Sequence, residues 1–282
     1  MSSTAPADPA HRKAAVLGSP IAHSRSPQLH LAAYRALGLP GWTYDRIECG
    51  AEELPALVAG FGPEWVGLSV TMPGKFAALA FADERTPRAE RIGSANTLVR
   101  TATGWLADNT DVDGVRGALG SAGHVAGLVS GRAIVLGSGG TAPAAVVALA
   151  ELGVSGITVA ARNPDNAARV VALATDVGVP ARYCDLADTA LAEAAAAATV
   201  TVSTVPADVA ARYAPVLARV PVLLDAVYDP WPTPLATAVS TAGGTVISGL
   251  QMLLHQAFTQ VELFTGRPAP CAAMTCAVAD PA

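Results

Sequence analysis

The sequence is poor in charge, and the charge it has is not biased toward basic residues. Only 15% of the 282 residues are Asp, Glu, Lys or Arg, whereas 51% are hydrophobic. Disordered chains show the opposite balance, so we expect a compact globular protein. The net charge of −5 offers no basic surface for nucleic acid. A negatively charged substrate would therefore have to be held by a few well-placed donors.

Cysteine is also scarce, and it follows no metal-binding spacing. Of the four cysteines only two are close together, and neither has a histidine nearby; the four are Cys49, Cys184, Cys271 and Cys276. This pattern predicts free thiols in a reducing compartment and no metal site. We therefore expect a cytoplasmic protein.

The chain lacks the sequence features of export and of membrane insertion. Residues 1–13, MSSTAPADPAHRK, are polar and proline-rich and hold no apolar segment of a signal peptide. The run from Ala133 to Ala150 has no charge and is long enough for a membrane helix. It is interrupted by GSGGTAP, however, and such a cluster of Gly, Ser and Pro predicts a turn between two buried elements. We predict a soluble protein that does not contact a membrane.

Apolar runs that predict strands alternate with helical patterns from the start of the chain. In the first part the predicted strands are 14–19, 42–49 and 65–71, and the predicted helices are 27–38, 51–61 and 74–83. Residues 96–100 and 104–111 predict a pair of strands joined at Thr103-Gly104. The length of the chain favours two domains, and the alternation indicates an α/β fold.

A second alternating series begins near residue 131. Its predicted strands are 132–137, 156–162, 181–186, 199–204, 220–228 and 244–248, and its predicted helices are 141–152, 166–177 and 188–198. Six strands with intervening helices indicate a doubly wound nucleotide-binding domain. A last predicted helix, 250–266, follows this domain, and we expect it to pack back against the first one.

The segment VLGSGGTAP, residues 135–143, is a glycine-rich turn between a predicted strand and a predicted helix. Glycine lets the backbone approach a pyrophosphate, and the N–H groups at a helix N-terminus attract an anion. Serine and threonine hydroxyls in the same turn could donate as well. We predict that the pyrophosphate of a dinucleotide is bound by Gly137, Ser138, Gly139, Gly140 and Thr141.

The end of the second strand of this series indicates which dinucleotide is bound. An NAD site typically has Asp or Glu there, to hold the ribose 2′-hydroxyl. The segment TVAARNPDN has no acid at that point and has Arg162 instead. A guanidinium suits a 2′-phosphate, so NADP is favoured over NAD. The alternative is an exposed arginine that only opens a loop. Arg169 is a possible second contact.

Polar residues gather where the strands of the first series end. Ser24 and Ser26 precede a predicted helix, where they could cap its N-terminus or bind a carboxylate. Lys75 follows the strand that ends in SVTMPGK, and Asp111 follows another strand. An ammonium and a carboxylate in one cleft can hold a substrate hydroxyl and exchange its proton. The alternative, which composition alone favours, is that Lys75 and Asp111 are ordinary charged residues on the surface.

Eight motifs along the chain together resemble the shikimate dehydrogenase family, of the actinobacterial type. In order, they are GSPIAHSRSP, SVTMPGK, SANTLV, DNTD, GSGGTA, STVP, YDPWPTP and ISGLQMLLHQA. The resemblance covers about residues 14 to 275. It implies a substrate-binding catalytic domain over 1–111, a Rossmann NADP-binding domain over 112–248, and a C-terminal helical segment over 249–282 on the substrate domain.

The resemblance also implies a reaction and a role for each site residue. The reaction is the NADPH-dependent, reversible reduction of 3-dehydroshikimate to shikimate, in aromatic amino acid (chorismate) biosynthesis. Lys75 and Asp111 would be the catalytic pair. The substrate carboxylate and hydroxyls would be bound by Ser24, Ser26, Thr71, Asn96, Tyr228 and Gln256, and the nicotinamide would be bordered by Gly249 and Met252. No metal is implied, and the chain would be a monomer or a homodimer.

The effects of three departures from the family pattern and three rival functions stay open. Ser69 stands where the family usually has asparagine, and Gly74 replaces an aromatic residue common before the lysine. Ala161 stands where asparagine often precedes the arginine, which keeps NAD use open. The nearest rival is a catabolic quinate/shikimate dehydrogenase that uses NAD. A second is a hydrolase with a serine–lysine pair, which would leave the glycine-rich turn without a purpose. A third is a non-catalytic NADP-binding regulator.

Overall fold

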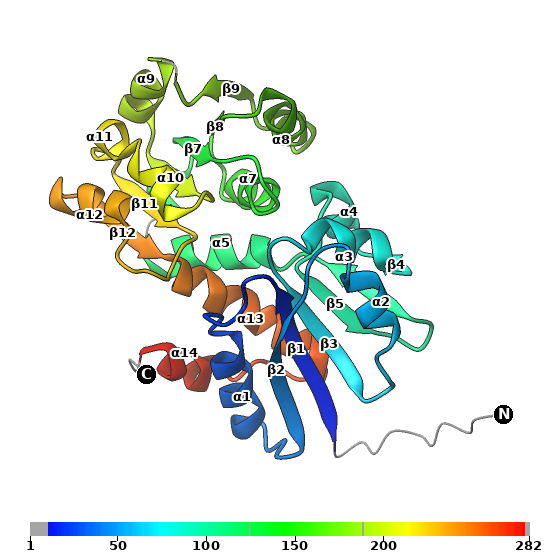
Figure 1. Ribbon diagram of the computed structural model, residues 1–282. Helices are drawn as coiled ribbons and strands as arrows, with labels where there is room; N and C mark the ends of the chain where they lie inside the picture. Colours follow the sequence, from blue (N-terminus) through cyan, green and yellow to red (C-terminus); the bar gives the residue numbers. More distant parts are fainter. Residues whose placement is uncertain (1–10, 124, 188, 280–282) are drawn as a thin grey trace. The chain divides into compact units, whose positions relative to one another are not determined.

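A computed structural model describes residues 11–123, 125–187 and 189–279. The chain divides into two units (Figure 1). Unit 1 extends to Thr110 and resumes at Ala257, and unit 2 comprises Asp111–Gln256. The sequence predicted the first division one residue later, at 111/112. It placed the second at 248/249, whereas the structure divides the last long helix itself.

Unit 1 is built on a mixed sheet of six strands (Figure 1). Its strand order is β2-β1-β3-β5-β6-β4. The strands are β1 (Arg12–Gly18), β2 (Trp42–Glu48), β3 (Trp65–Val70), β4 (Glu84–Arg85), β5 (Thr97–Arg100) and β6 (Trp105–Asp108). β1 runs parallel to β2 and β3, and β5 runs antiparallel to β3 and β6. The carboxyl ends of β1 and β3 therefore lie at the edge of the sheet where β5 begins.

Helices pack their apolar residues onto this sheet. They are α1 (Ser26–Ala36), α2 (Leu54–Ala59), α3 (Lys75–Phe81), α4 (Pro87–Ile92) and the second half of α13 (Gly249–Thr265), and α14 (Cys271–Ala279) packs on α1. Leu17, Leu68 and Leu98 from three strands are fully buried. The ring of Phe264 fills the space over Gly67, where a Cβ would lie 2.1 Å from it. The second half of α13 is thereby fixed on the sheet of unit 1.

Unit 2 is a parallel sheet of six strands with the order β12-β11-β10-β7-β8-β9 (Figure 1). The strands are β7 (Arg132–Leu136), β8 (Gly156–Ala161), β9 (Ala181–Asp185), β10 (Val200–Ser203), β11 (Val222–Asp225) and β12 (Thr245–Ser248). This order is that of a doubly wound Rossmann domain, as the sequence predicted. The order reverses between β7 and β10, and nucleotides bind at the carboxyl ends of strands at such a point.

The helices of unit 2 include three that the sequence predicted. The full set is α5 (Asp111–Ser121), α6 (Val125–Leu128), α7 (Ala142–Glu151), α8 (Pro164–Asp176), α9 (Ala190–Ala197), α10 (Ala207–Ala211), α11 (Ala214–Leu217), α12 (Pro234–Thr241) and the first half of α13. In unit 2 the sequence patterns do not predict α5, α6, α10, α11 or α12, and in unit 1 they do not predict α4 or α14. Within the described ranges, no helix combines the length and the apolar character needed to cross a bilayer.

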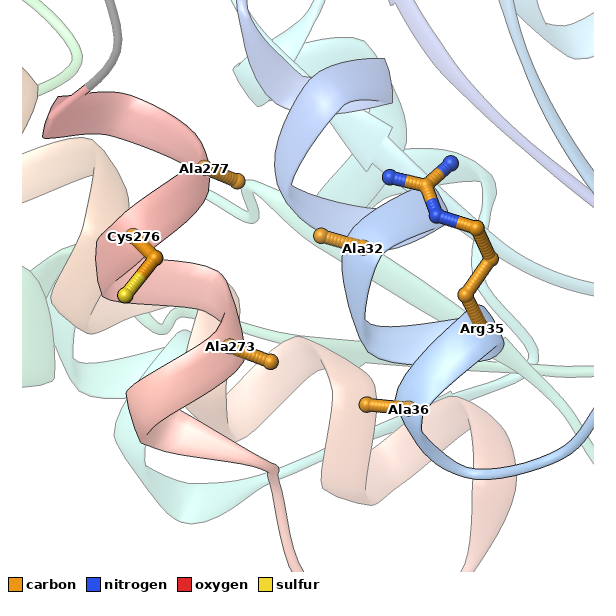
Figure 2. Close-up of a pocket in the computed structure, with 6 residues that line it drawn as sticks. All are labelled: Ala32, Arg35, Ala36, Ala273, Cys276 and Ala277. Carbon is orange, nitrogen blue, oxygen red and sulfur yellow. The ribbon is translucent and has the colours of Figure 1, made fainter.

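An open groove of about 500 Å³ runs between α1 and α14 (Figure 2). Figure 2 shows Ala32 and Ala36 of α1 facing Ala273 and Ala277 of α14. Small side chains let these two helices approach each other closely. None of the residues that the sequence singled out for chemistry lines this groove, so the candidate site lies elsewhere.

Candidate active site

Three polar segments of unit 1 meet at the edge of the sheet where β1 and β3 end. Thr71 directly follows β3, and its N–H donates to the carbonyl of Leu17 on β1 at 2.9 Å. The N–H of Val70 donates to the carbonyl of Asn96, just before β5, at 2.7 Å. These segments are far apart in the sequence, and the strand pairing of the sheet brings them together.

Lys75 lies at this edge as the first residue of α3. β3 ends at Val70, and a turn closed by the N–H of Gly74 on the carbonyl of Thr71, at 2.8 Å, leads into the helix. The Lys75 carbonyl accepts from the N–H of Ala95 at 2.9 Å, which ties the start of α3 to the segment that carries Asn96. The strand stop and the helix start that the sequence predicted are both present.

Neither Ser24 nor Ser26 is the N-cap residue of α1. That residue is Arg25, whose side chain makes no cap hydrogen bond, and Ser26 is the first residue of the helix. The Ser24 hydroxyl accepts from the N–H of Ser26 at 3.3 Å and so satisfies one N–H at this end of the helix. Both serines are nearly buried, at 9% and 4% exposure. The two hydroxyls therefore lie at the N-terminus of an eleven-residue helix, where the helix dipole favours a negative charge.

The Asn96 amide is held in one orientation by its neighbours. Its Nδ2 donates to the Thr110 hydroxyl at 3.0 Å, and its Oδ1 accepts from the Thr110 N–H at 2.7 Å. Its Oδ1 also accepts from the Thr97 hydroxyl at 2.8 Å. Asn96 is 2% exposed, so these bonds replace water around the amide.

A buried polar network that the sequence did not predict lies beneath these residues. Gln260 of α13 accepts from the Ser69 hydroxyl at 2.8 Å, and its Nε2 donates to the Thr97 hydroxyl at 3.0 Å. Ser69 in turn accepts from the Tyr44 hydroxyl at 2.6 Å. Ser69, where the family usually has asparagine, thus bonds inside the protein. Position alone could have flagged Gln260, since it lies one helical turn after the predicted site residue Gln256.

His30 completes this network from α1. The imidazole is fully buried, stacks on Tyr44 with the ring centroids 4.0 Å apart, and lies 3.3 Å through its Nε2 from the Gln260 Oε1. Burial lowers the pKa of His30 to about 3, opposed in part by the bond with Gln260. The ring is therefore neutral at pH 7, and its Nε2–H donates to Gln260.

We expect His30 to make the protein sensitive to acid. Its pKa is lowered in the folded state, so below about 6.5 the unfolded chain gains a proton that the folded chain does not. The stability is complete above pH 6.5 and is lost as the pH falls toward 3. The free energy of unfolding should drop by about 2 kcal/mol between pH 7 and pH 5 from this residue alone. Urea unfolding of the wild type and His30→Gln at both pH values measures it. An equal drop in both proteins would contradict the expectation.

Asp111, the second predicted catalytic residue, is the first residue of α5 and belongs to unit 2. It is 2% exposed. A negative side chain in the first turn of a helix interacts favourably with the helix dipole. Lys75 and Asp111 are thus held by different units, and each has a defined place within its own unit.

The glycine-rich turn of unit 2 follows β7 at the point where the strand order reverses. Gly137 has φ +110°, and a Cβ there would lie 2.6 Å from the Thr204 hydroxyl, so only glycine fits. A Cβ on Gly139 would meet no atom within 4 Å, so the backbone faces open space there. Thr141 is the N-cap of α7, and its side chain makes no cap hydrogen bond. Such a turn fits a pyrophosphate, because the backbone at Gly139 faces open space and a helix N-terminus follows it.

Arg162 lies where the sequence predicted, just after β8 and exposed. The next residue, Asn163, caps α8 by accepting from the N–H of Asn166 at 3.0 Å. The side chain of Arg169, the possible second contact, donates to Asn166. The neighbouring strand ends in Asp185, whose carboxylate is engaged by the N–H of Ala187 and the Tyr183 hydroxyl. The side chain of Arg162 is therefore exposed at the carboxyl end of β8.

The remaining predicted residues lie together in unit 2 around the start of α13. Gly249 is its first residue, and a Cβ there would lie 2.1 Å from the carbonyl oxygen of Ala226. The loop that carries the partly exposed Tyr228 is therefore in backbone contact with α13. Met252 is 5% exposed, and α5 packs on it through Gly114. Gln256, the last residue of the unit, is half-buried.

Asp225 anchors this loop. It ends β11 with no exposed surface, and its carboxylate accepts from the Thr233 hydroxyl at 2.7 Å and from the Val227 N–H at 3.2 Å. Burial raises the pKa of Asp225, and these hydrogen bonds oppose the shift. Both ends of the loop segment that contains Tyr228 are fixed by this one side chain.

Comparison with known proteins decides which family has this arrangement. The model of the shikimate dehydrogenase substrate binding domain matches residues 16–98, and that of the shikimate 5'-dehydrogenase C-terminal domain matches residues 249–278. The chain is 38% identical over 273 residues to the shikimate dehydrogenase (NADP(+)) of Anaeromyxobacter sp. (strain Fw109-5), covering 94% of this chain and 95% of that one. The chain belongs to the shikimate dehydrogenase family.

Solved structures of the shikimate dehydrogenase family have the same fold. The crystal structure of Mycobacterium tuberculosis shikimate dehydrogenase matches with a TM-score of 0.90 and 72% identity, over 95% of this chain and 99% of that one. That of Thermus thermophilus shikimate 5-dehydrogenase, in complex with NADP(H) and shikimate, matches with a TM-score of 0.78 and 30% identity, over 95% and 98%. The predicted family, α/β fold, oxidoreductase class and NADP cofactor are confirmed.

Proposed function

We propose that this chain catalyses the reversible, NADPH-dependent reduction of 3-dehydroshikimate to shikimate in aromatic amino acid biosynthesis. The observation that carries the proposal is the edge of the unit 1 sheet. Backbone hydrogen bonds join Thr71, the start of α3 at Lys75 and the segment of Asn96 at this edge. In the same unit, the hydroxyls of Ser24 and Ser26 lie at the N-terminus of α1. Membership of the shikimate dehydrogenase family supports the same reaction.

Each group has a task that its chemistry suits. Ser24 and Ser26 hold the substrate carboxylate at the N-terminus of α1. The ring hydroxyls are bound by Thr71, Asn96 and Gln256, and Tyr228 adds a contact to the carboxylate. These are neutral hydrogen-bonding groups, and a site built from them rejects analogues that lack the hydroxyls.

The proton and the cofactor are handled by separate groups. Lys75 donates the proton to the carbonyl oxygen, and Asp111 orients the ammonium, provided both reach the oxygen at about 2.6–3.2 Å. The hydride that reduces the carbonyl carbon is supplied by NADPH when it is bound. The turn Gly137, Ser138, Gly139, Gly140 and Thr141 holds its pyrophosphate, Arg162 its 2′-phosphate, and Gly249 and Met252 border its nicotinamide.

The direct test is the fall in NADPH absorbance when 3-dehydroshikimate is added to the purified protein. We expect rapid oxidation of NADPH that depends on the substrate. In the reverse direction, shikimate and quinate are each offered with NADP and with NAD. We expect shikimate with NADP to be the best pair. Quinate with NAD as the best pair would assign the chain to the catabolic enzymes instead.

Two other outcomes separate the remaining rivals. Binding of NADPH in a thermal-shift titration without any turnover would indicate a regulator that only senses its ligand. Absence of NADPH binding would favour the serine–lysine hydrolase. We further propose that the protein acts in the cytoplasm as a monomer or a homodimer, which light scattering on the active protein would distinguish.

A further inference from the structure

A continuous chain of buried hydrogen bonds links two of the proposed substrate contacts inside unit 1. From Tyr44 it runs through Ser69 and Gln260 to Thr97, which donates to the Oδ1 of Asn96. At its other end the Ser26 hydroxyl faces that of Tyr44 and helps to lower its pKa against the effect of burial. These side chains come from five different elements and the loop before β5, and none is more than 5% exposed. We call this chain the Ser26–Asn96 relay.

The middle of the relay has little freedom. The Oε1 of Gln260 faces two donors, the Ser69 hydroxyl at 2.8 Å and the neutral ring of His30 at 3.3 Å, while its Nε2 faces the Thr97 hydroxyl and the Asn96 carbonyl. The amide can take only one orientation. Buried polar groups are costly unless they are hydrogen-bonded, and here each side chain from Tyr44 to Asn96 has a partner. Removing one member would leave its neighbours buried without a partner, so the relay holds its two ends in place.

The hydroxyl protons of the relay can point in either of two directions. In the first, Ser26 donates to Tyr44, Tyr44 to Ser69, and Ser69 to Gln260. A carboxylate at Ser26 needs a donor, so Ser26 must then turn its proton outward and accept from Tyr44. The Tyr44 hydroxyl has a single proton, which then points to Ser26. The Ser69 hydroxyl must therefore turn and donate to the Tyr44 oxygen. Gln260 stays satisfied in both states because His30 also donates to its Oε1.

We propose that Tyr44, Ser69 and Gln260 are positioning residues that hold Ser26 and Asn96 for the carboxylate and a hydroxyl of the substrate, and that the hydroxyl protons of the relay reverse when the carboxylate binds. The proposal rests on the proposed function, since it takes Ser26 and Asn96 as substrate contacts. Burial raises the pKa of the Tyr44 hydroxyl, so Tyr44 stays protonated and can donate a hydrogen bond to Ser26.

The chain contains a matched control for Tyr44. Tyr34 is also buried, at 1% exposure, and its ring is edge-on to His30 with centroids 6.0 Å apart. Its hydroxyl has no hydrogen-bond partner in the part of the chain that the structure describes. Tyr44→Phe and Tyr34→Phe thus remove the same atom from the same aromatic cluster, one inside the relay and one outside it.

The test compares these two variants and Ser69→Ala in steady-state reduction of 3-dehydroshikimate by NADPH. We expect Tyr44→Phe and Ser69→Ala each to raise the KM for 3-dehydroshikimate about tenfold, the worth of about one hydrogen bond. kcat and the KM for NADPH should change by less than about threefold. The double variant should be little worse than either single one, because both break the same relay. Tyr34→Phe should match the wild type.

Each other outcome has one meaning. A KM within about twofold of wild type in folded Tyr44→Phe, or an equal rise in Tyr34→Phe, overturns the relay and leaves the proposed function intact. If Tyr44→Phe does not fold, as judged by thermal unfolding, Ser69→Ala decides by the same criterion. If the wild type itself does not oxidise NADPH with 3-dehydroshikimate, the proposed function fails, and the relay's role fails with it.

Discussion

Lys75→Ala should lower the turnover of 3-dehydroshikimate by a factor on the order of 10²–10⁴, which is the usual contribution of a positioned acid–base group. The substitution removes the ammonium that we propose to protonate the carbonyl oxygen. The fold should tolerate it, because Lys75 is a partly exposed first residue of α3 and alanine is a good helix former. Single-turnover measurement with saturating NADPH isolates the chemical step, and the dissociation constant of shikimate should change much less.

The chain offers a simple control, since Lys13 is its other lysine. Lys13 lies at the amino end of β1, opposite the edge that carries Lys75, and its ammonium sits 5.8 Å from the Trp65 ring centroid. Lys13→Ala makes the same change in net charge, and we expect turnover near that of the wild type. Near-normal turnover in Lys75→Ala would refute the catalytic role of Lys75, whatever the control shows.

Local sequence patterns were sufficient for most of the fold, and they failed where distant contacts override local preference. α5 is an example, because its sequence DVDGVRGALGS contains glycines that normally weaken a helix. The structure shows why they are there. A Cβ on Gly114 would lie 2.7 Å from the Met252 carbonyl, and one on Gly117 would lie 2.4 Å from the His255 ring. The glycines let α5 and α13 pack closely, and no pattern within α5 reveals that.

In the candidate site, too, some residues could be predicted from local sequence patterns and others could not. The residues beside strand ends could be found from the sequence, because Pro, Gly and polar residues mark where a strand stops. The relay could not be found, since Ser69 and Gln260 are 191 positions apart and meet only through the packing of α13 on β3. The N-cap was also missed. The helix starts at Ser26, one residue earlier than the predicted start at residue 27, so Arg25 takes the cap position.

Arg162→Asp should exchange the cofactor preference. A guanidinium on a 2′-phosphate makes charge-assisted hydrogen bonds worth about 1.5–3 kcal/mol, and a carboxylate in its place repels the phosphate. We expect kcat/KM for NADPH to fall on the order of 10²-fold. The kcat/KM for NADH should stay the same or rise, because an acid at this strand end accepts a hydrogen bond from the ribose 2′-hydroxyl. Arg162 is exposed between β8 and α8, so the fold should be unaffected.

Comparison of the two cofactors separates the 2′-phosphate from the rest of the site. NADPH and NADH share the pyrophosphate, so damage to the turn at Gly137 would weaken both equally, whereas the loss of a 2′-phosphate contact weakens NADPH alone. Arg132→Asp is the control for net charge, since Arg132 is exposed at the amino end of β7, away from the carboxyl ends of the strands. An unchanged preference for NADPH in Arg162→Asp would show that another group holds the phosphate. An equal loss of kcat/KM for NADPH in Arg132→Asp would mean that the change in the net charge of unit 2, and not a contact with the 2′-phosphate, causes the effect.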